Sequence, residues 1–541
     1  MAKGFGQCVN LNCAVILLPV LRRLLRGAAE KYDRNNVFPF KKAVEFHKII
    51  GLAVFCSVFG HLFFHYLNFA FKSEISVLSF GNAAYITGGI LTLAMALIFS
   101  GAHYTVRRAN YEIFWSTHHF YTVFYLALLA HAPHFWQWLL IPVFLFIQEK
   151  KSRAATRGQR KIFVESAEFI PPVLNINFSP EKFEEFDFRG GQYLYMLVPA
   201  ISEREWHPFS MSSAYGDLEA SGYVSLHIRV QEPGSWTYRL KEYFRLIAGQ
   251  GGDKPQDPFL ANTLHHYDAA GNKKPGLHSG PDGKPLLLID GPYSSPTQVY
   301  SSYRDIILVG SGIGLTPSAS ILRSVLRHKW KKGYYPETIR FCWILRANEI
   351  DSFHWFIELL ADLSERVASD RLSGAIDDSH YLELNIYVTG TDNSDLDVST
   401  KSPRSKDAAS GREKTGSTSI SNREIHIDPN ILRKKLLNPE IDSKDQPEVQ
   451  IAETAAPNRM EDIWIWRGRP NWDTVFNSTQ ESIINRRKAR GDHIALVQDE
   501  SEVGVCFCGH PVIGKDLKKR CAKFTKTNDQ MIKFTLNAEV F

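Results

Sequence analysis

The chain has 541 residues, with 63 lysines and arginines against 57 aspartates and glutamates, and a formal net charge of +6. This length suits about three domains, each with its own core. The basic residues gather beside apolar stretches and form no continuous stripe, which favours a membrane protein over a nucleic-acid-binding one.

The seven cysteines follow neither zinc nor disulfide spacing, so we expect reduced thiols and a cytosolic soluble part. Cys506 and Cys508 alternate within an apolar run and are expected in a β-strand.

Apolar stretches fill most of the first 150 residues and predict a membrane bundle of five spans. They lie at about 8–27, 46–70, 82–103, 112–132 and 135–149. A helix needs about 20 residues to cross a bilayer, so only the last stretch is short. The basic turns fall on one side if the spans alternate, and we assign that side to the cytosol. A signal peptide over residues 1–27 is the alternative, but its arginines lie on the wrong flank.

Two of these stretches each contain a pair of histidines. His47 and His61 are 14 residues apart, about 21 Å of helix rise, and His118 and His131 are 13 apart, about 19.5 Å. On parallel helices these rises place one histidine of each helix at each of two depths. Neutral imidazole is a good iron ligand, so the pattern predicts two stacked haems held by these four residues.

The two pairs differ in helical phase. A 14-residue spacing leaves an offset of about 40° around the helix, whereas a 13-residue spacing leaves about 140°. The second helix must therefore bend, carry a π-bulge or present different faces to the two haems. His119 and His134 are neighbouring alternatives, and His65 shares a face with His47. Spacing alone leaves the ligands open.

From about residue 160, short alternating runs predict an antiparallel β-barrel. A segment beginning at His207 follows one such strand, and a serine hydroxyl and an aromatic ring there suit the edge and face of a flavin. A second segment offers a cation and backbone donors to the flavin pyrophosphate. The predicted FAD-binding residues are His207, Pro208, Phe209, Ser210, Ser213, Arg229, Gly234, Trp236 and Thr237.

From about residue 305, apolar strands alternate with helical stretches, which predicts a doubly wound α/β domain. A strand, a glycine turn and a helix bring backbone N–H groups to a dinucleotide pyrophosphate. Arg346 ends the next strand where NAD would favour an acid, and Arg469 offers a second cation, so NADPH is favoured over NADH. Phe541 is a candidate to stack on the flavin. The other predicted dinucleotide-site residues are Gly310, Gly312, Gly314, Thr316, Pro317, Cys508 and Gly509.

These patterns divide the chain into three domains. We expect a bis-haem membrane domain over residues 1–150, an FAD-binding barrel over 151–298 and an NADPH-binding α/β domain over 299–541. A loop insertion is expected at 248–284. A second insertion at about 390–458 is rich in polar residues and poor in aromatics, so we expect it to be disordered.

With these motifs in order, the sequence resembles the catalytic subunit of an NADPH oxidase, a transmembrane flavocytochrome b. The likeness rests on Phe114-Trp-Ser-Thr-His-His119, His207-Pro-Phe-Ser210, Gly310-Ser-Gly-Ile-Gly-Leu-Thr-Pro317 and Cys508-Gly509. Short features such as Gly468-Arg-Pro-Asn-Trp472 resemble the calcium-regulated, EF-hand-bearing subfamily most. The resemblance implies a ferric-reductase-like haem bundle followed by a ferredoxin-reductase-like module. It also implies that His47 and His118 hold the inner haem and that His61 and His131 hold the outer one.

The chain departs from that family in three ways. The family has six membrane helices, and this chain starts at what resembles the second, as a short isoform, an incomplete gene model or an engineered fragment would. No Asp-x-Asp-x-Asp-Gly calcium loop is present, so we expect no calcium site here. Lys3 stands where the family places an arginine near the outer oxygen site, and we assign a catalytic role there to His65 and Lys3.

The expected activity is electron transfer from cytosolic NADPH through FAD and two haems to oxygen, which generates superoxide and thence peroxide across the membrane. One alternative is a ferric or cupric metalloreductase. Another is a truncated, non-catalytic partner of a full-length oxidase. Membrane lipid and oxygen are the expected partners, with homo-oligomers or pairing with a full-length oxidase as options and no nucleic acid. The plasma membrane is the expected location.

Overall fold

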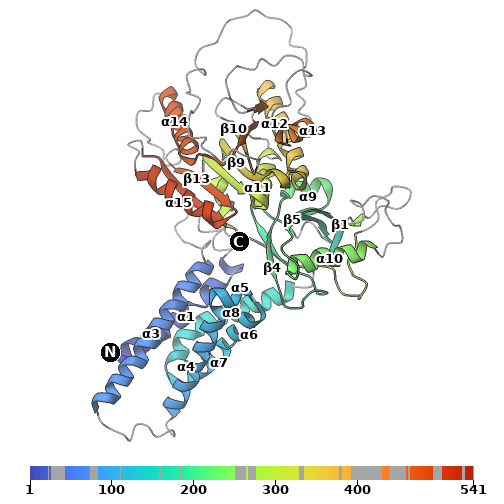
Figure 1. Cartoon of the computed structure of the whole chain (residues 1–541). Coiled ribbons are helices and arrows are strands. Elements are labelled where there is room, and N and C mark those ends of the chain that lie inside the picture. Colours follow the sequence, from blue (N-terminus) through green and yellow to red (C-terminus); the bar gives the residue numbers. More distant parts are fainter. Residues whose placement is uncertain are drawn as a thin grey trace, which may run out of the picture. The chain divides into compact units, whose positions relative to one another are not determined.

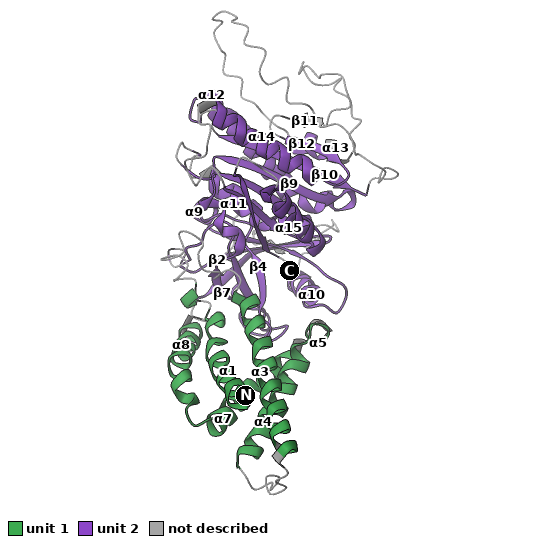
Figure 2. Ribbon diagram, turned by 90° about the vertical axis from the view of Figure 1, so that its left-hand side faces the viewer, with its two compact units in different colours: residues 1–155 green, residues 156–541 purple. Residues whose placement is uncertain are grey.

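The structure is a computed structural model. It describes residues 1–21, 23–25, 43–72, 83–109, 111–156, 160–182, 184, 186–249, 264–265, 276–327, 330, 334–376, 380–390, 429–437, 458–460, 463–490, 502–526 and 531–539. The chain divides into two compact units, Met1–Ala155 and Thr156–Phe541 (Figure 2).

The first unit is helical throughout its described elements (Figure 1). These are α1 (Ala2–Val15), the short 3-10 helix η1 (Leu18–Val20), α3 (Ala43–Lys72), α4 (Ala83–Ala102), α5 (Tyr104–Ala109), α6 (Tyr111–His118), α7 (Tyr121–His131) and α8 (Phe135–Thr156). Helix α1 packs along α3, and α4 packs along both α6 and α7. Gly101 permits the contact between α4 and α6, because a Cβ there would clash with Thr117 Oγ1.

The helices differ from the five expected spans in two places. The first stretch forms no single span, since α1 ends at Val15 and a 3-10 turn containing Pro19 follows. Proline lacks the N–H that a continuing helix needs. The fourth stretch is broken between α6 and α7. Among the described residues, Ala43–Asn68 and Ala83–Ala102 are the two helical segments long and apolar enough to cross a membrane.

The second unit begins with an antiparallel barrel, as the alternating runs predict. One sheet has the order β5-β2-β1-β6 and the other β4-β3-β7. The strands are β1 (Ile162–Ile170), β2 (Val173–Pro180), β3 (Tyr193–Leu197), β4 (His207–Ser210), β5 (Val224–Arg229), β6 (Leu264–His265) and β7 (Leu288–Tyr293). Helices α9 (Tyr215–Ser221) and α10 (Trp236–Gly249) and the 3-10 helix η6 (Pro296–Ser302) complete it. Strand β6 pairs with β1, so the expected loop insertion contributes to the barrel.

The rest of the second unit is the expected doubly wound domain. Its seven-stranded sheet has the order β11-β12-β10-β9-β8-β13-β14, and β11 alone among these described strands runs antiparallel to its neighbour. The strands are β8 (Asp305–Ser311), β9 (Thr338–Arg346), β10 (Tyr381–Thr389), β11 (Asn458–Met460), β12 (Ile463–Arg467), β13 (Glu502–Cys508) and β14 (Lys533–Glu539). The helices are η7 (Gly312–Leu315), α11 (Thr316–Arg327), η8 (Ala347–Phe353), α12 (His354–Leu372), α13 (Pro429–Leu437), α14 (Trp472–Arg490) and α15 (Pro511–Lys526).

The second insertion contains a helix where the sequence predicts disorder. Helix α13 buries Leu432 and Leu436 completely in the main core, and Arg433 pairs with Asp351 of η8 at 2.6 Å. Two leucines four residues apart give this short helix an apolar face. The mean composition of the insertion hides that local pattern, so the expectation of disorder was wrong for 429–437.

All seven cysteines are free thiols. Cys506 and Cys508 lie in β13 and are 1% and 2% exposed, which confirms their assignment to a strand.

Candidate functional site

The four predicted histidines meet as two pairs in the helical unit. The ring centroids of His47 and His118 are 6.2 Å apart, and those of His61 and His131 are 6.3 Å apart. Each pair joins α3 to the α6–α7 segment. The arrangement therefore supplies two separate two-imidazole sites.

Hydrogen bonds at Nδ1 orient three of these rings. His47 Nδ1 donates to the Ile16 carbonyl at 3.0 Å, and His61 Nδ1 donates to the Ala2 carbonyl at 2.9 Å. The Thr87 hydroxyl donates to the Ala83 carbonyl, so its oxygen accepts from His131 Nδ1 at 2.9 Å. A proton on Nδ1 leaves the Nε2 lone pair free to bind metal, and such outer hydrogen bonds also fix the ring direction.

The break in the second histidine helix accounts for the 13-residue spacing. Helix α6 ends at His118, residues 119 and 120 form a turn, and α7 starts at Tyr121. The turn resets the helical phase, so His118 and His131 both reach partners on α3 although a straight helix would turn them about 140° apart. Of the open alternatives, His119 instead contacts Trp115, and His134 is exposed.

The spacing of the rings fits a metal ion held between them. Two imidazoles on opposite sides of one iron place their centroids about 6 Å apart, because each coordinating nitrogen lies about 2 Å from the metal. Among the described residues no group of three or more His, Cys, Asp or Glu side chains is arranged to hold a metal. Haem iron takes its other donors from the macrocycle, so two imidazoles are the protein ligands that a haem would need.

The two residues predicted at the oxygen side lie near the second pair. The His65 ring is 4.5 Å from the His61 ring, and the His65 side chain is exposed. Lys3 follows Ala2, whose carbonyl accepts the His61 hydrogen bond, and the Lys3 side chain is also exposed. His65 therefore adjoins the candidate ligand His61, while Lys3 adjoins it through the backbone.

In the second unit, Trp236 brings the two predicted flavin segments together. The centroid of its ring lies 4.2 Å from that of His207, with the rings tilted, and 5.9 Å from that of Phe209, with the rings stacked. Trp236 Nε1 is buried and has no hydrogen-bond partner among the described residues, so it is a donor available to a ligand. Gly234 has φ +89° with open space around it, which suits close approach of a phosphate. These features fit an FAD pyrophosphate.

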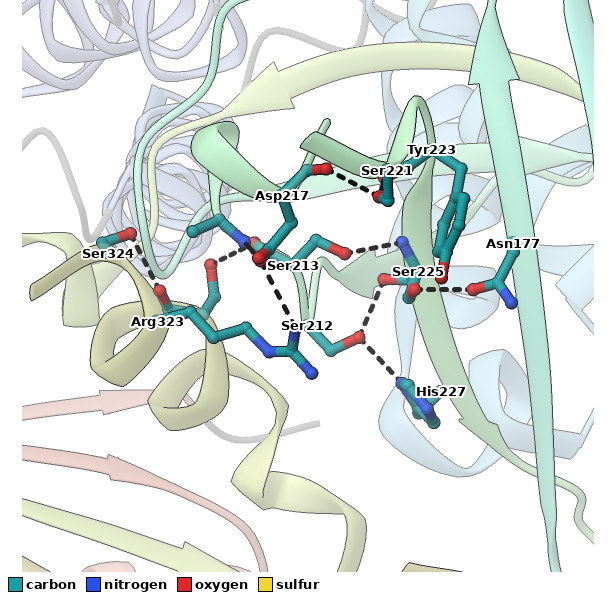
Figure 3. A network of polar contacts seen from close by, with 12 residues as sticks. Asn177, Ser212, Ser213, Asp217, Ser221, Tyr223, Ser225, His227, Arg323 and Ser324 are labelled. Atoms are coloured by element: carbon teal, nitrogen blue, oxygen red, sulfur yellow. Dashed lines mark hydrogen bonds and ion pairs between the residues drawn. The ribbon is translucent and has the colours of Figure 1, made fainter. Parts of the chain in front are cut away.

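Other predicted flavin residues are engaged with the protein itself. The Ser213 hydroxyl accepts from the Ser225 backbone N–H at 2.8 Å (Figure 3), and Thr237 Oγ1 accepts from the Gln231 N–H at 3.0 Å. Arg229 donates to Glu349 of η8 at 2.8 Å. Ser213 and Thr237 shape the loops around the site, and Arg229 also links the barrel to the α/β domain.

The glycine turn and the cysteine segment meet at the carboxyl edge of the parallel sheet. Gly310 of β8 pairs with Cys508 of β13. A Cβ on Gly314 would clash with the Cys508 carbonyl oxygen, so only glycine fits. Gly312, with φ +53°, opens the turn before Thr316 and Pro317 begin α11. A glycine turn at a helix N-terminus fits a dinucleotide pyrophosphate.

The two predicted NADPH arginines lie at the same edge. Arg346 ends β9 in register with Thr389 of β10, and Arg469 follows β12, which also pairs with β10. Both side chains are exposed. They flank the strand ends that carry a dinucleotide in doubly wound folds. Phe541 lies outside the described residues.

Glu539 is a candidate residue that the sequence analysis missed. It lies on β14 in register with Cys508, is 6% exposed, and accepts from Thr297 Oγ1 at 2.6 Å. Burial raises the pKa of Glu539, although the hydrogen bond from Thr297 opposes the shift. Burial also raises the pKa of Cys508, and Glu539 adds to that shift. The only sequence signal was a lone glutamate near the C-terminus.

Comparison with known proteins agrees with this arrangement. The family described as "Ferric reductase like transmembrane component" matches residues 4–129, an FAD-binding domain family matches 169–297, and "Ferric reductase NAD binding domain" matches 303–522. A superoxide-generating NADPH oxidase heavy chain of Dictyostelium discoideum is 28% identical over 100% of this chain and 89% of its own length. The chain is therefore similar along its whole length to an NADPH oxidase, with ferric-reductase-like transmembrane, FAD-binding and NAD-binding domains in order.

Further relatives span different shares of their own length. Human NADPH oxidase 5 is 28% identical over 97% of this chain, which spans 64% of that oxidase. Human NADPH oxidase 3 is 23% identical over 100% of this chain and 91% of its own length. The flavohemoglobin of Malassezia yamatoensis aligns over 98% of both chains, but a TM-score of 0.32 at 10% identity is too weak a likeness to inform the fold. The likeness thus rests on matched domains in the predicted order.

Proposed function

We propose that this chain carries electrons from NADPH through FAD and two haems across a membrane to oxygen, and so generates superoxide. The two imidazole pairs are the observation that carries the proposal. Their separations of 6.2 and 6.3 Å fit one metal ion per pair. The relatives named as superoxide-generating support oxygen as the acceptor. In the balanced reaction, one NADPH and two O2 give NADP⁺, one proton and two superoxide ions.

When bound, FAD would supply chemistry that side chains lack, because a flavin can accept two electrons as hydride and release them one at a time. The protein positions these groups. Trp236, Gly234 and Arg229 would hold the flavin phosphates, while the glycine turn and its helix N-terminus would hold those of NADPH. Ser210 offers its hydroxyl at the flavin edge. Glu539, with its raised pKa, can hold a proton beside Ser210 and Cys508.

The oxygen end is assigned to His65 and Lys3. His47 with His118 and His61 with His131 would hold the two haems, which would supply one-electron chemistry for the reduction of oxygen. Positive or hydrogen-bonding groups beside the outer haem would then stabilise the developing superoxide charge. His65, 4.5 Å from His61, has the better placement of the two. His65→Leu should lower superoxide output while haem spectra stay unchanged, and an unchanged output would remove this role.

The chain is a membrane protein, as the matched transmembrane family indicates. We assign its flavin and NADPH domains to the cytosol, because the basic turns of the helical unit predict that side. The plasma membrane as location and homo-oligomers or pairing with a longer oxidase as assemblies remain predictions from the sequence.

Proteoliposomes containing the full chain, loaded with FAD and haem, test the proposal. External NADPH should drive superoxide formation inside the vesicles, read by an enclosed cytochrome c sensitive to superoxide dismutase. Ferric chelate enclosed in parallel vesicles tests the metalloreductase alternative. Oxygen consumption that exceeds ferric reduction supports the oxidase. Exclusive ferric reduction contradicts it, and flavin reduction without any haem reduction favours the non-catalytic partner.

A further inference from the structure

Strand β5 carries two residues that face the α/β domain, and one is the predicted phosphate-binding arginine. Arg229 Nη2 lies 2.8 Å from Glu349 Oε1. The Glu349 side chain is 9% exposed and that of Arg229 is 37% exposed. This ion pair joins the barrel to η8, the first turn after the strand that ends at Arg346. A mostly buried carboxylate thus faces the cation expected to bind flavin phosphate.

The same pair lies against the glycine turn. A Cβ on Gly312 would be 3.8 Å from Arg229 Nη1 and 3.9 Å from Glu349 Oε2. The predicted flavin-phosphate cation and the predicted NADPH-phosphate turn are therefore neighbours. A guanidinium has five N–H donors in a fixed plane, so the bond to Glu349 orients the donors on Nη1 and Nε toward a second acceptor.

A second contact from β5 fixes the same two domains. The His227 ring stacks on Trp355 of α12 at 3.7 Å with an angle of 18° between the ring planes. The Ser212 hydroxyl donates to the Ser225 carbonyl at 2.9 Å and accepts from His227 Nδ1 at 2.7 Å (Figure 3). His227 and Arg229 are two residues apart on one strand, so they share a face. Together they place η8 and α12 against the barrel.

We propose that Glu349 is a positioning residue that competes with phosphate for Arg229 and holds its guanidinium between the flavin and NADPH sites. The inference rests on the proposed function, because it takes Arg229 as a ligand of the FAD pyrophosphate. In this arrangement Glu349 weakens phosphate binding and at the same time aligns the two domains. Removing the charge of Glu349 should strengthen FAD binding but slow the reduction of the flavin by NADPH. Loss of a purely structural contact would not produce both effects.

The test compares Glu349→Gln with the unaltered full chain in lipid nanodiscs. FAD affinity, measured by quenching of flavin fluorescence, should rise about threefold to tenfold, because a charge-assisted competitor is removed. Anaerobic stopped-flow reduction of the flavin by NADPH should slow about twofold to fivefold at saturating FAD, because Arg229 loses its fixed direction. Unchanged or weaker FAD binding overturns the proposal.

A matched control lies on the same 3-10 helix. Asp351 is two residues from Glu349 but pairs with Arg433, and its side chain is 62% exposed. Asp351→Asn removes one carboxylate without touching Arg229, so FAD affinity should stay within a factor of about two. An equal rise in both variants would show a general charge effect and would overturn a specific role for Glu349.

The Arg229→Ala variant tests the flavin assignment of Arg229 separately from the positioning role of Glu349. If it weakens FAD binding and Glu349→Gln added to it changes nothing further, the two residues act as one unit. If Arg229→Ala leaves FAD affinity unchanged, the flavin assignment of Arg229 fails. If Arg229→Ala weakens binding but Glu349→Gln alone does not strengthen it, only the positioning role fails.

Discussion

The two segments that carry the histidine pairs present their imidazoles by different backbone geometries. Helix α3 carries His47 and His61 on an unbroken helix of 30 residues, where a 14-residue spacing keeps both on one face. The segment carrying His118 and His131 has a 13-residue spacing and is interrupted by a turn at 119–120. The comparison shows that each histidine must have the right direction as well as the right depth, so the 13-residue spacing requires a break that the 14-residue spacing does not.

The largest expected effect is the loss of a single imidazole from either helix. His131→Leu should remove one of two haems, because a two-ligand site cannot lose half of its protein donors and keep the same coordination. Haem quantitation on the purified protein should fall from two per chain to about one. His134→Leu is the matched control, since His134 is exposed and near the same helix end, and it should keep both haems. Equal loss in both variants would contradict the pairing.

A nearly equal loss of haem is expected when the turn at 119–120, between α6 and α7, is altered. Inserting one alanine after His119 would lengthen the turn at 119–120 and so change the rotation of α7 relative to α6. His131 should then lose its partner while His118 keeps His47, so the reduced-minus-oxidised spectrum should report one haem. The same insertion after Lys72, outside the histidine pairs, is the control. Two intact haems in the first variant would show that the turn is not what aligns the rings.

In the second unit, more groups contribute to nucleotide binding than the two histidines of each pair contribute to haem binding. A single substitution there should therefore reduce binding less. Arg346→Ala removes one of two arginines at the sheet edge and should lower the preference for NADPH over NADH about tenfold, the effect of one charge-assisted contact. The ratio of kcat/KM for flavin reduction by the two nucleotides measures it. Arg433→Ala, on α13, removes an exposed arginine that pairs with Asp351 and serves as control. An unchanged ratio in Arg346→Ala would contradict the assignment.

The smallest effect concerns Glu539 and pH. Because its folded pKa is raised, the unfolded chain ionises first, and stability is lost as pH rises from about 4.5 through the folded pKa. Glu539→Gln should remove that loss while keeping an acceptor for Thr297. The thermal stability of the second unit within the full chain is followed between about pH 4.5 and 7.5. It should fall less with rising pH in Glu539→Gln than in the unaltered chain. Parallel curves would show that Glu539 ionises normally.

Much of the architecture was predictable from periodicity. The apolar strands expected from about residue 305 are present in the structure, among them β8, β9, β10 and β13. Parallel strands buried on both faces read as continuous apolar runs, so they stand out. The doubly wound fold followed from these runs and the glycine turn.

Local departures from the mean pattern were harder to predict. The turn after His118 has no proline or glycine to mark it, and only the helical phase of the histidines indicated an irregularity. Helix α13 was hidden by its polar surroundings. The pairing of Arg229 with Glu349 joins residues 120 apart, so it depends on how two domains pack and leaves no sequence pattern.

The most direct test of the account is haem content and ligation in the purified chain. Pyridine haemochrome analysis together with low-temperature electron paramagnetic resonance should find two low-spin haems per chain with bis-imidazole signals. His47→Leu and His61→Leu should each remove a different one of the two signals, since the pairs are separate. A chain that binds no haem, or one whose signals survive both substitutions, would contradict the central claim.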